Sequence, residues 1–165
     1  MKRNTAPLLS FCAFLIAIFS CNNPSRNSSS MESNKLTDFG KNYAHAWCSQ
    51  KPDSVAAFFA ERGSLTVNNG TPAVGRTAIA KVAESFMTAF PDMIVNMDSI
   101  ATTSRGVEFH WTLTGTNTGS NGTGKMVRIS GVEIWQLDEN GLVKESKGSF
   151  DSNEYNRQLQ YGVDN

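Results

Sequence analysis

The apolar periodicity of this chain changes most clearly at Pro91. Before Pro91, six apolar residues follow one another at the spacing of a single helix face: Ile79, Val82, Ala83, Phe86, Met87 and Phe90. After it, apolar and polar residues alternate, most regularly from 107 to 114, as in strands with one buried face. Proline cannot continue a helix. Helices that precede a run of strands predict an α+β domain with the helices on one side of an antiparallel sheet.

The other predicted elements follow the same order. Apolar residues at helical spacing predict a first helix that begins near Asn34 and includes Trp47. Pro52 begins a short second helix that we expect to continue to Arg62 and to stop at Gly63. The predicted strands cover residues 64–69, 93–103, 107–114, 126–136 and 142–150, and a short helix or tail follows at 152–160.

The N-terminus differs from the rest of the chain. Lys2 and Arg3 precede an almost wholly apolar stretch from Leu8 to Phe19. At about 1.5 Å per residue this stretch spans roughly 18 Å, which is short of a bilayer core of about 30 Å. We interpret residues 1–20 as a secretory signal peptide. The junction before Cys21 resembles a bacterial lipobox, and the alternative is a plain signal peptide beside a chance cysteine.

This interpretation divides the chain into three parts. Residues 1–20 are the lipoprotein signal peptide, residues 21–33 are a polar, flexible tether, and residues 34–165 are the folded domain. We expect lipid on Cys21 to hold the domain at the bacterial cell envelope, with no other contact to a membrane. The sequence leaves open whether this is the inner or the outer membrane.

Composition excludes several classes of function. Lys plus Arg number 15 and Asp plus Glu number 15, so the chain lacks the basic excess of a nucleic-acid-binding protein. Two histidines and three cysteines form no metal-binding motif and no disulfide framework. Residues 119–126 nearly match a phosphate-binding loop, but Met126 stands where a hydroxyl is needed and a strand follows.

Asp151 is the residue that this pattern favours for chemistry. It ends the last predicted strand, on the same side as Lys147 and Ser149 by alternation. If that side lines a cavity, desolvation raises the pKa of Asp151 toward the range of a general acid or base. The alternative is a helix cap, because Glu154 stands three residues later at the spacing of a capping box.

Aromatic residues supply the walls of the expected cavity. Each of them lies on the buried face of its predicted helix or strand, and together they are expected to line or support one apolar pocket: Trp47, Phe86, Phe90, Phe109 and Trp111.

Several short motifs resemble the SnoaL-like polyketide cyclases, within the nuclear transport factor 2-like superfamily that includes ketosteroid isomerase. They are Phe90-Pro91-Asp92, the segments 114–119, 123–125 and 140–143, and Asp151 with Gln158-Leu159 behind it. The resemblance covers residues 36–162. It implies a cone-shaped, curved sheet covered by three N-terminal helices, an apolar pocket and a homodimer.

The resemblance also implies cofactor-free proton transfer by Asp151. Two positions depart from the family pattern. Asn117 stands where the family usually has His, and we expect it to donate a hydrogen bond to a developing oxyanion. Lys147 stands where the family often has Trp, which makes it an expected pocket residue. The homodimer is expected to form through the outer sheet face at Glu108, His110 and Thr112.

Two functions remain open at this stage. The first is an aldol cyclase or isomerase that needs no metal or organic cofactor and acts on a small apolar or aromatic ligand with a carbonyl group. The second is a binding module that holds the same kind of ligand without chemistry. Epoxide hydrolysis is a third possibility within the superfamily, but it needs an Asp-Arg-Asp arrangement, and no Arg can be placed beside Asp151.

Overall fold

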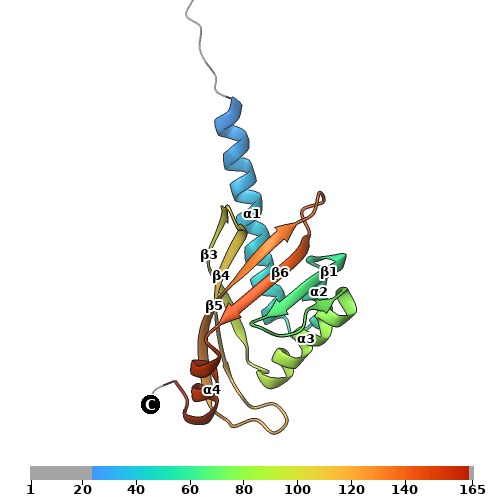
Figure 1. The fold of residues 1–165 in the computed structure, drawn as a ribbon. Coiled ribbons are helices and arrows are strands. Elements are labelled where there is room, and N and C mark those ends of the chain that lie inside the picture. The colour runs from blue at the N-terminus through green and yellow to red at the C-terminus, as the bar shows by residue number, and fades with distance from the viewer. Residues whose placement is uncertain (1–23, 164–165) are drawn as a thin grey trace, which may run out of the picture.

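The computed structural model describes residues 24–163 as one α+β unit (Figure 1). Its elements in chain order are α1 (Pro24–Cys48), α2 (Pro52–Ala56), β1 (Phe59–Val67), β2 (Ala73–Val74), α3 (Arg76–Ala89), β3 (Ile94–Thr103), β4 (Gly106–Thr116), β5 (Met126–Leu137), β6 (Val143–Phe150) and α4 (Ser152–Tyr161). The predicted change from helices to strands at Pro91 is confirmed.

The strands form a single curved sheet in the order β2-β1-β6-β5-β4-β3. All neighbouring strands are antiparallel except β1 and β6, which run parallel. The expectation of a fully antiparallel sheet is therefore wrong for one pair. The reason is that β1 and β6 lie far apart in the chain, so no hairpin forces them to run in opposite directions.

The helices α1 and α3 both bury apolar side chains in the core. In α1, Tyr43 is wholly buried and Trp47 nearly so, while in α3 the predicted stripe buries Ile79, Ala83 and Met87. Figure 1 shows the C-terminal half of α1 lying along the sheet and its N-terminal half extending beyond it. The core is thus enclosed between the helices and the concave side of the sheet.

Two predicted boundaries are wrong. The helix α1 begins at Pro24, so it includes residues 24–33, where we expected an irregular tether; a proline is well suited to the first turn of a helix. The second helix ends at Ala56 instead of Arg62, and β1 begins at Phe59. Pairing of Phe59 with Val143 on β6 outweighs the local helical pattern there.

The predicted signal peptide and Cys21 lie outside the described residues. Their roles therefore remain predictions. Within residues 24–163, no helix is both long and apolar enough to cross a membrane.

Candidate functional site: an apolar pocket with one buried carboxyl group

The pocket lies between α1, α3 and the concave face of the sheet. Its cavity volume is about 50 Å³. A single water molecule needs roughly 10–15 Å³ on the same scale, so a small organic group fits. The lining residues come from α1, α3 and all strands except β2: Trp47, Leu65, Val67, Phe86, Val95, Phe109, Trp111, Leu113, Glu133, Gly148 and Phe150.

Glu133, on β5, is the only ionisable side chain among these lining residues. It is 6% exposed and accepts hydrogen bonds from three other side chains. Its Oε2 lies 2.6 Å from Ser146 Oγ, 2.9 Å from Trp135 Nε1 and 3.1 Å from the Tyr43 hydroxyl oxygen. Its Oε1 lies 3.3 Å from the same hydroxyl of Tyr43 and has no other protein donor among the described residues. One carboxyl oxygen is thus held by the protein, and the other is nearly unoccupied.

Burial changes the acid–base properties of this group. Removal from water disfavours the charged carboxylate and raises the pKa of Glu133, although the three donors oppose that shift. Burial, together with the nearby charge of Glu133, raises the pKa of Tyr43 well above its usual value, so Tyr43 remains a neutral donor. The pair joins α1 to β5 across the floor of the pocket.

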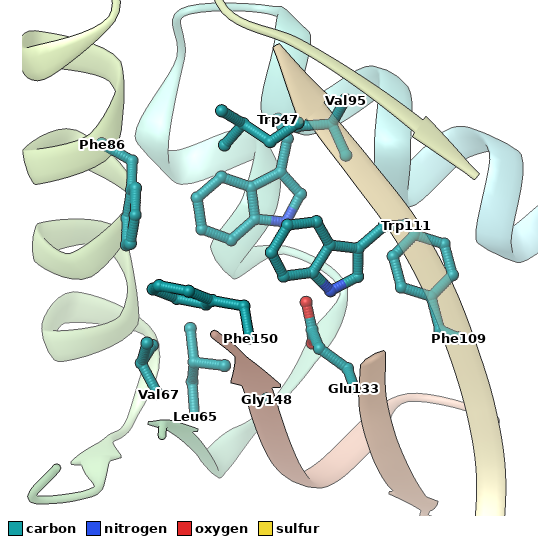
Figure 2. A pocket seen from close by; sticks show the side chains of 11 residues that line it. Trp47, Leu65, Val67, Phe86, Val95, Phe109, Trp111, Glu133, Gly148 and Phe150 are labelled. Atoms are coloured by element: carbon teal, nitrogen blue, oxygen red, sulfur yellow. The ribbon is translucent and has the colours of Figure 1, made fainter. Parts of the chain in front are cut away.

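Trp111, on β4, presents a second polar atom. Its indole Nε1 is buried and has no hydrogen-bond partner. Among the described residues it is the one buried side-chain nitrogen or oxygen atom that lacks a partner. Figure 2 shows the indole nitrogen turned toward the Glu133 carboxyl group, among the rings of Trp47, Phe86 and Phe150. The pocket therefore has apolar walls and one polar spot.

Four of the five predicted aromatic residues line this pocket. Trp47, Phe86, Phe109 and Trp111 are all part of its wall, as periodicity predicted. Phe90 is wholly buried but packs outside the lining, with its ring centroid 6.3 Å from that of Tyr155. It supports the pocket without facing the cavity.

The expected pocket position of Asp151 is wrong. Asp151 is exposed at the start of α4, where its Oδ1 accepts the backbone N–H groups of Asn153 and Glu154 at 2.9 and 3.0 Å. This is the helix-cap alternative. Asp151 is not among the residues that line the pocket.

A β-bulge in β6 explains this error. Leu137 on β5 pairs with Val143, but its neighbour Gln136 pairs with Glu145, so Lys144 is an extra residue. If side chains are counted as alternating from the buried Val143, every residue of β6 after the bulge is therefore assigned to the wrong face of the sheet. Lys147, also expected in the pocket, is on the outer face, where its side chain is 66% exposed and forms an ion pair with Glu145 at 3.2 Å.

Asn117 also lies away from the pocket. It follows β4, donates from Nδ2 to the carbonyl of Ala89 at 3.1 Å, and accepts the backbone N–H of Thr123 at 2.8 Å. These bonds fix the loop between β4 and β5 against the end of α3. The expected oxyanion contact is therefore wrong, and in this chain Asn117 stabilises a loop.

Sequence reasoning missed Glu133. A signal was present, because Glu133 has the same strand parity as the buried Val127, Ile129 and Trp135. A charged residue in such a series is an exception that indicates function. The signal is weak because Val132 and Ile134, on the other face of β5, are also apolar. Alternation alone therefore does not show which face is buried here.

The fold and the pocket define a small α+β domain with a ligand-sized cavity on the concave side of one curved sheet. The sequence profile of the SnoaL-like polyketide cyclases matches residues 37–159. The chain therefore belongs to the SnoaL-like polyketide cyclase family, which confirms the resemblance. A search of curated proteins finds no significant match to the sequence.

Solved structures of distant relatives share the fold. A protein described as a SnoaL-like polyketide cyclase from Jannaschia sp. CCS1 is 14% identical, with a TM-score of 0.66 over 81% of this chain and 94% of that one. A protein with a ketosteroid isomerase-like fold from Catenulispora acidiphila, in complex with trimethylamine, is 13% identical, with a TM-score of 0.64 over 73% and 91%. An epoxide hydrolase of the LEH-like type from M. tuberculosis is 13% identical, with a TM-score of 0.62 over 78% and 92%.

Proposed function

We propose that the pocket binds a small, largely apolar molecule with a carbonyl group, and that Glu133 moves a proton on it without a cofactor. The observation that carries this proposal is the position of Glu133, the single ionisable group of the pocket lining, buried at its floor. Structures described as a polyketide cyclase and an epoxide hydrolase share the fold, so the scaffold is compatible with chemistry on small molecules.

The proposed step transfers one proton from the ligand to Glu133 and back. Ionised Glu133 takes a proton from the carbon next to the carbonyl group, and the electron pair of that C–H bond forms an enolate. In a ligand with a carbon–carbon double bond next to that carbon, the enolate is conjugated and takes the proton back from Glu133 at the far carbon of the double bond, which is isomerisation. In a ligand with a second carbonyl group, the enolate carbon attacks that carbonyl carbon and the resulting alkoxide takes the proton from Glu133, which is aldol cyclisation. A carboxyl group with a raised pKa is suited to the return of the proton as well as to its removal.

Hydrogen exchange tests the proposal without knowledge of the natural substrate. In D₂O, NMR follows the loss of the methyl protons of acetophenone and other methyl ketones. We expect the wild-type protein to accelerate this loss and Glu133→Gln to reduce the acceleration at least about a hundredfold. Asp151→Ala is the matched control, because it removes a carboxylate outside the pocket. Equal rates for wild type and Glu133→Gln would exclude Glu133 as the base.

A binding module remains the second candidate, and one observation favours it. Oε2 of Glu133 already accepts three protein hydrogen bonds, which is more than proton transfer requires and fits a structural role. If the ketones bind but none of them exchanges protons faster, binding without chemistry is the better account.

We propose further that the domain is attached to the bacterial cell envelope through lipid on Cys21 and that it forms a homodimer. The outer face of β4, with exposed His110 between Glu108 and Thr112, is the proposed dimer surface. Its support is the mixed polar and charged character of that face. Sedimentation at micromolar concentration tests it: a monomer throughout, or a dimer that survives His110→Glu with Thr112→Glu, contradicts this surface.

A further inference from the structure

We infer that the indole N–H of Trp111 is the donor that selects the ligand, so that the pocket takes neutral molecules with a hydrogen-bond-accepting oxygen and disfavours ammonium ions. This inference rests on the proposed function and names the group that the site recognises. It starts from a single defect in the hydrogen bonding of the described residues: Trp111 Nε1 is buried and has no partner.

A buried donor without a partner is costly, and native proteins seldom keep one without a use. Trp111 belongs to the wall of the cavity, so an atom that enters the cavity can accept its proton. Because the indole nitrogen carries a hydrogen and no available lone pair, its partner must be an acceptor. An oxygen in the pocket meets this need, and an ammonium group does not.

The hydrogen bonds of Glu133 point to the same ligand. Oε2 accepts from Ser146, Trp135 and Tyr43, so a proton on the neutral carboxyl group belongs on Oε1. Burial favours this neutral form by raising the pKa of Glu133. In this neutral form the hydroxyl of Oε1 and the N–H of Trp111 are two donors in the pocket wall, and Figure 2 shows the indole nitrogen turned toward the carboxyl group. The carbonyl oxygen of the ligand accepts from both in the neutral form. When Glu133 is ionised and takes a proton from the ligand, Trp111 alone is the donor.

The aromatic walls favour a different ligand when they are considered alone. The rings of Trp47, Phe86, Phe109, Trp111 and Phe150 surround the space, and such rings attract cations. A related fold has been solved with trimethylamine. An ammonium ion would leave the Trp111 donor unpaired and would place a positive charge against the positive end of the N–H bond. We therefore assign the aromatic rings to apolar packing and the specificity to Trp111.

Three probes of similar shape separate these alternatives. Ethylbenzene has no polar group, acetophenone carries an acceptor oxygen, and 1-phenylethylamine is an ammonium ion at neutral pH. Their dissociation constants are measured for the wild-type protein, Trp111→Phe and Trp47→Phe. Trp47→Phe is the matched control, because it removes the same amount of wall from the same pocket but not the unpaired donor.

We expect wild type to bind acetophenone roughly two- to tenfold more tightly than ethylbenzene, the effect of one net hydrogen bond, and to bind the ammonium ion most weakly. Trp111→Phe should abolish the preference for acetophenone, while Trp47→Phe keeps it. Tightest binding of 1-phenylethylamine, or an unchanged preference in Trp111→Phe, overturns the inference and leaves the proposed pocket intact. Failure of all three probes to bind contradicts the proposed function itself, and the inference with it.

A second measurement does not require that Trp111→Phe folds. The chain contains three tryptophans, so ¹⁵N-labelled protein gives three indole N–H signals. Trp47→Phe identifies one signal, and the donor bond from Trp135 to Glu133 distinguishes the other two through Glu133→Gln. Acetophenone should move the Trp111 signal downfield and ethylbenzene should not. Equal shifts with both probes contradict a hydrogen bond to the ligand.

Discussion

The indole ring of Trp111 lies against Gly131, its direct partner on the neighbouring strand. A Cβ atom on Gly131 would stand 2.5 Å from Cζ2 of Trp111, and 2.6 Å from the carbonyl oxygen of Ser149. Real Cβ atoms do not approach other atoms so closely, so only glycine leaves room for the ring here. Gly131 thereby determines where the ring of Trp111 lies and hence where its N–H points.

Gly131→Ala should therefore destabilise the domain and disturb the pocket together. We expect a loss of about 1–3 kcal/mol in the free energy of unfolding, since both the ring and a backbone carbonyl must move. Urea unfolding measures it. Gly148→Ala is the control, because its Cβ would meet its nearest atoms at an ordinary 3.4 Å. Equal costs for the two variants would contradict the close contact at Gly131.

The buried carboxyl group predicts a pH dependence with a definite sign. Because its pKa is raised from 4.5, Glu133 keeps its proton in the folded state at pH values where the unfolded chain has lost it. Its contribution to stability is complete below pH 4.5 and declines as the pH rises through the folded value. Glu133→Gln cannot titrate, so the stability of wild type relative to this variant should fall with rising pH. A constant difference between pH 4 and 8 would contradict the shift.

Phe86, on α3, and Phe90, at its C-terminal end, should contribute differently to the free energy of unfolding. Phe90 is wholly buried, so Phe90→Ala should cost about 3–5 kcal/mol. Phe86 is half-buried at the pocket wall, and Phe86→Ala should cost less, roughly 1–3 kcal/mol, and should widen the cavity. A larger cost for Phe86 than for Phe90 would mean that the pocket is closed over Phe86.

Asp151 should behave as a helix cap. Asp151→Ala should cost about 1 kcal/mol of stability, because two backbone N–H groups of α4 lose their acceptor. Asp151→Asn, which keeps the acceptor oxygen, should cost much less. Neither change should alter ketone binding or exchange. If Asp151→Asn loses the acceleration of hydrogen exchange in the ketones, Asp151 and not Glu133 is the base.

Cys21 should control attachment to the membrane. When the full chain is expressed in a bacterium, the wild-type protein should fractionate with membranes, and Cys21→Ser should release it. Mass spectrometry of the wild-type N-terminus should find lipid on Cys21. A Cys21→Ser variant that stays in the membrane and keeps residues 1–20 indicates an uncleaved apolar anchor instead.

Local patterns were sufficient for most of the elements and for four of the eleven residues that line the pocket. The stripe from Ile79 to Phe90 and the alternation through Phe109 and Trp111 depend only on helix and strand periodicity, and both are confirmed. The family resemblance added the curvature of the sheet. Together they predict the fold and four of the five aromatic residues that line the pocket.

The chemistry of the site could not be predicted in the same way. One extra residue at Lys144 exchanges the two faces of β6, and no local pattern marks such a bulge. Strand alternation therefore pointed to the wrong face for Asp151, and the family resemblance pointed to the same residue. The strand parity of Glu133 indicates its burial, but its hydrogen bonds with Tyr43 and Ser146 join elements distant in the chain, and no local pattern predicts them.

The parallel pairing of β1 with β6 also has a consequence for how the chain acquires its structure. Phe59 pairs with Val143 and Val67 with Gly148, so the middle of the sheet joins segments from opposite ends of the domain. Until β6 has been made, β1 has only the two-residue β2 beside it, and β3, β4 and β5 form a separate antiparallel group. Such distant contacts slow folding. A nascent chain that stops before Val143 therefore holds two fragments of a sheet with no strand pairing between them, and the domain should fold and unfold as a single cooperative unit.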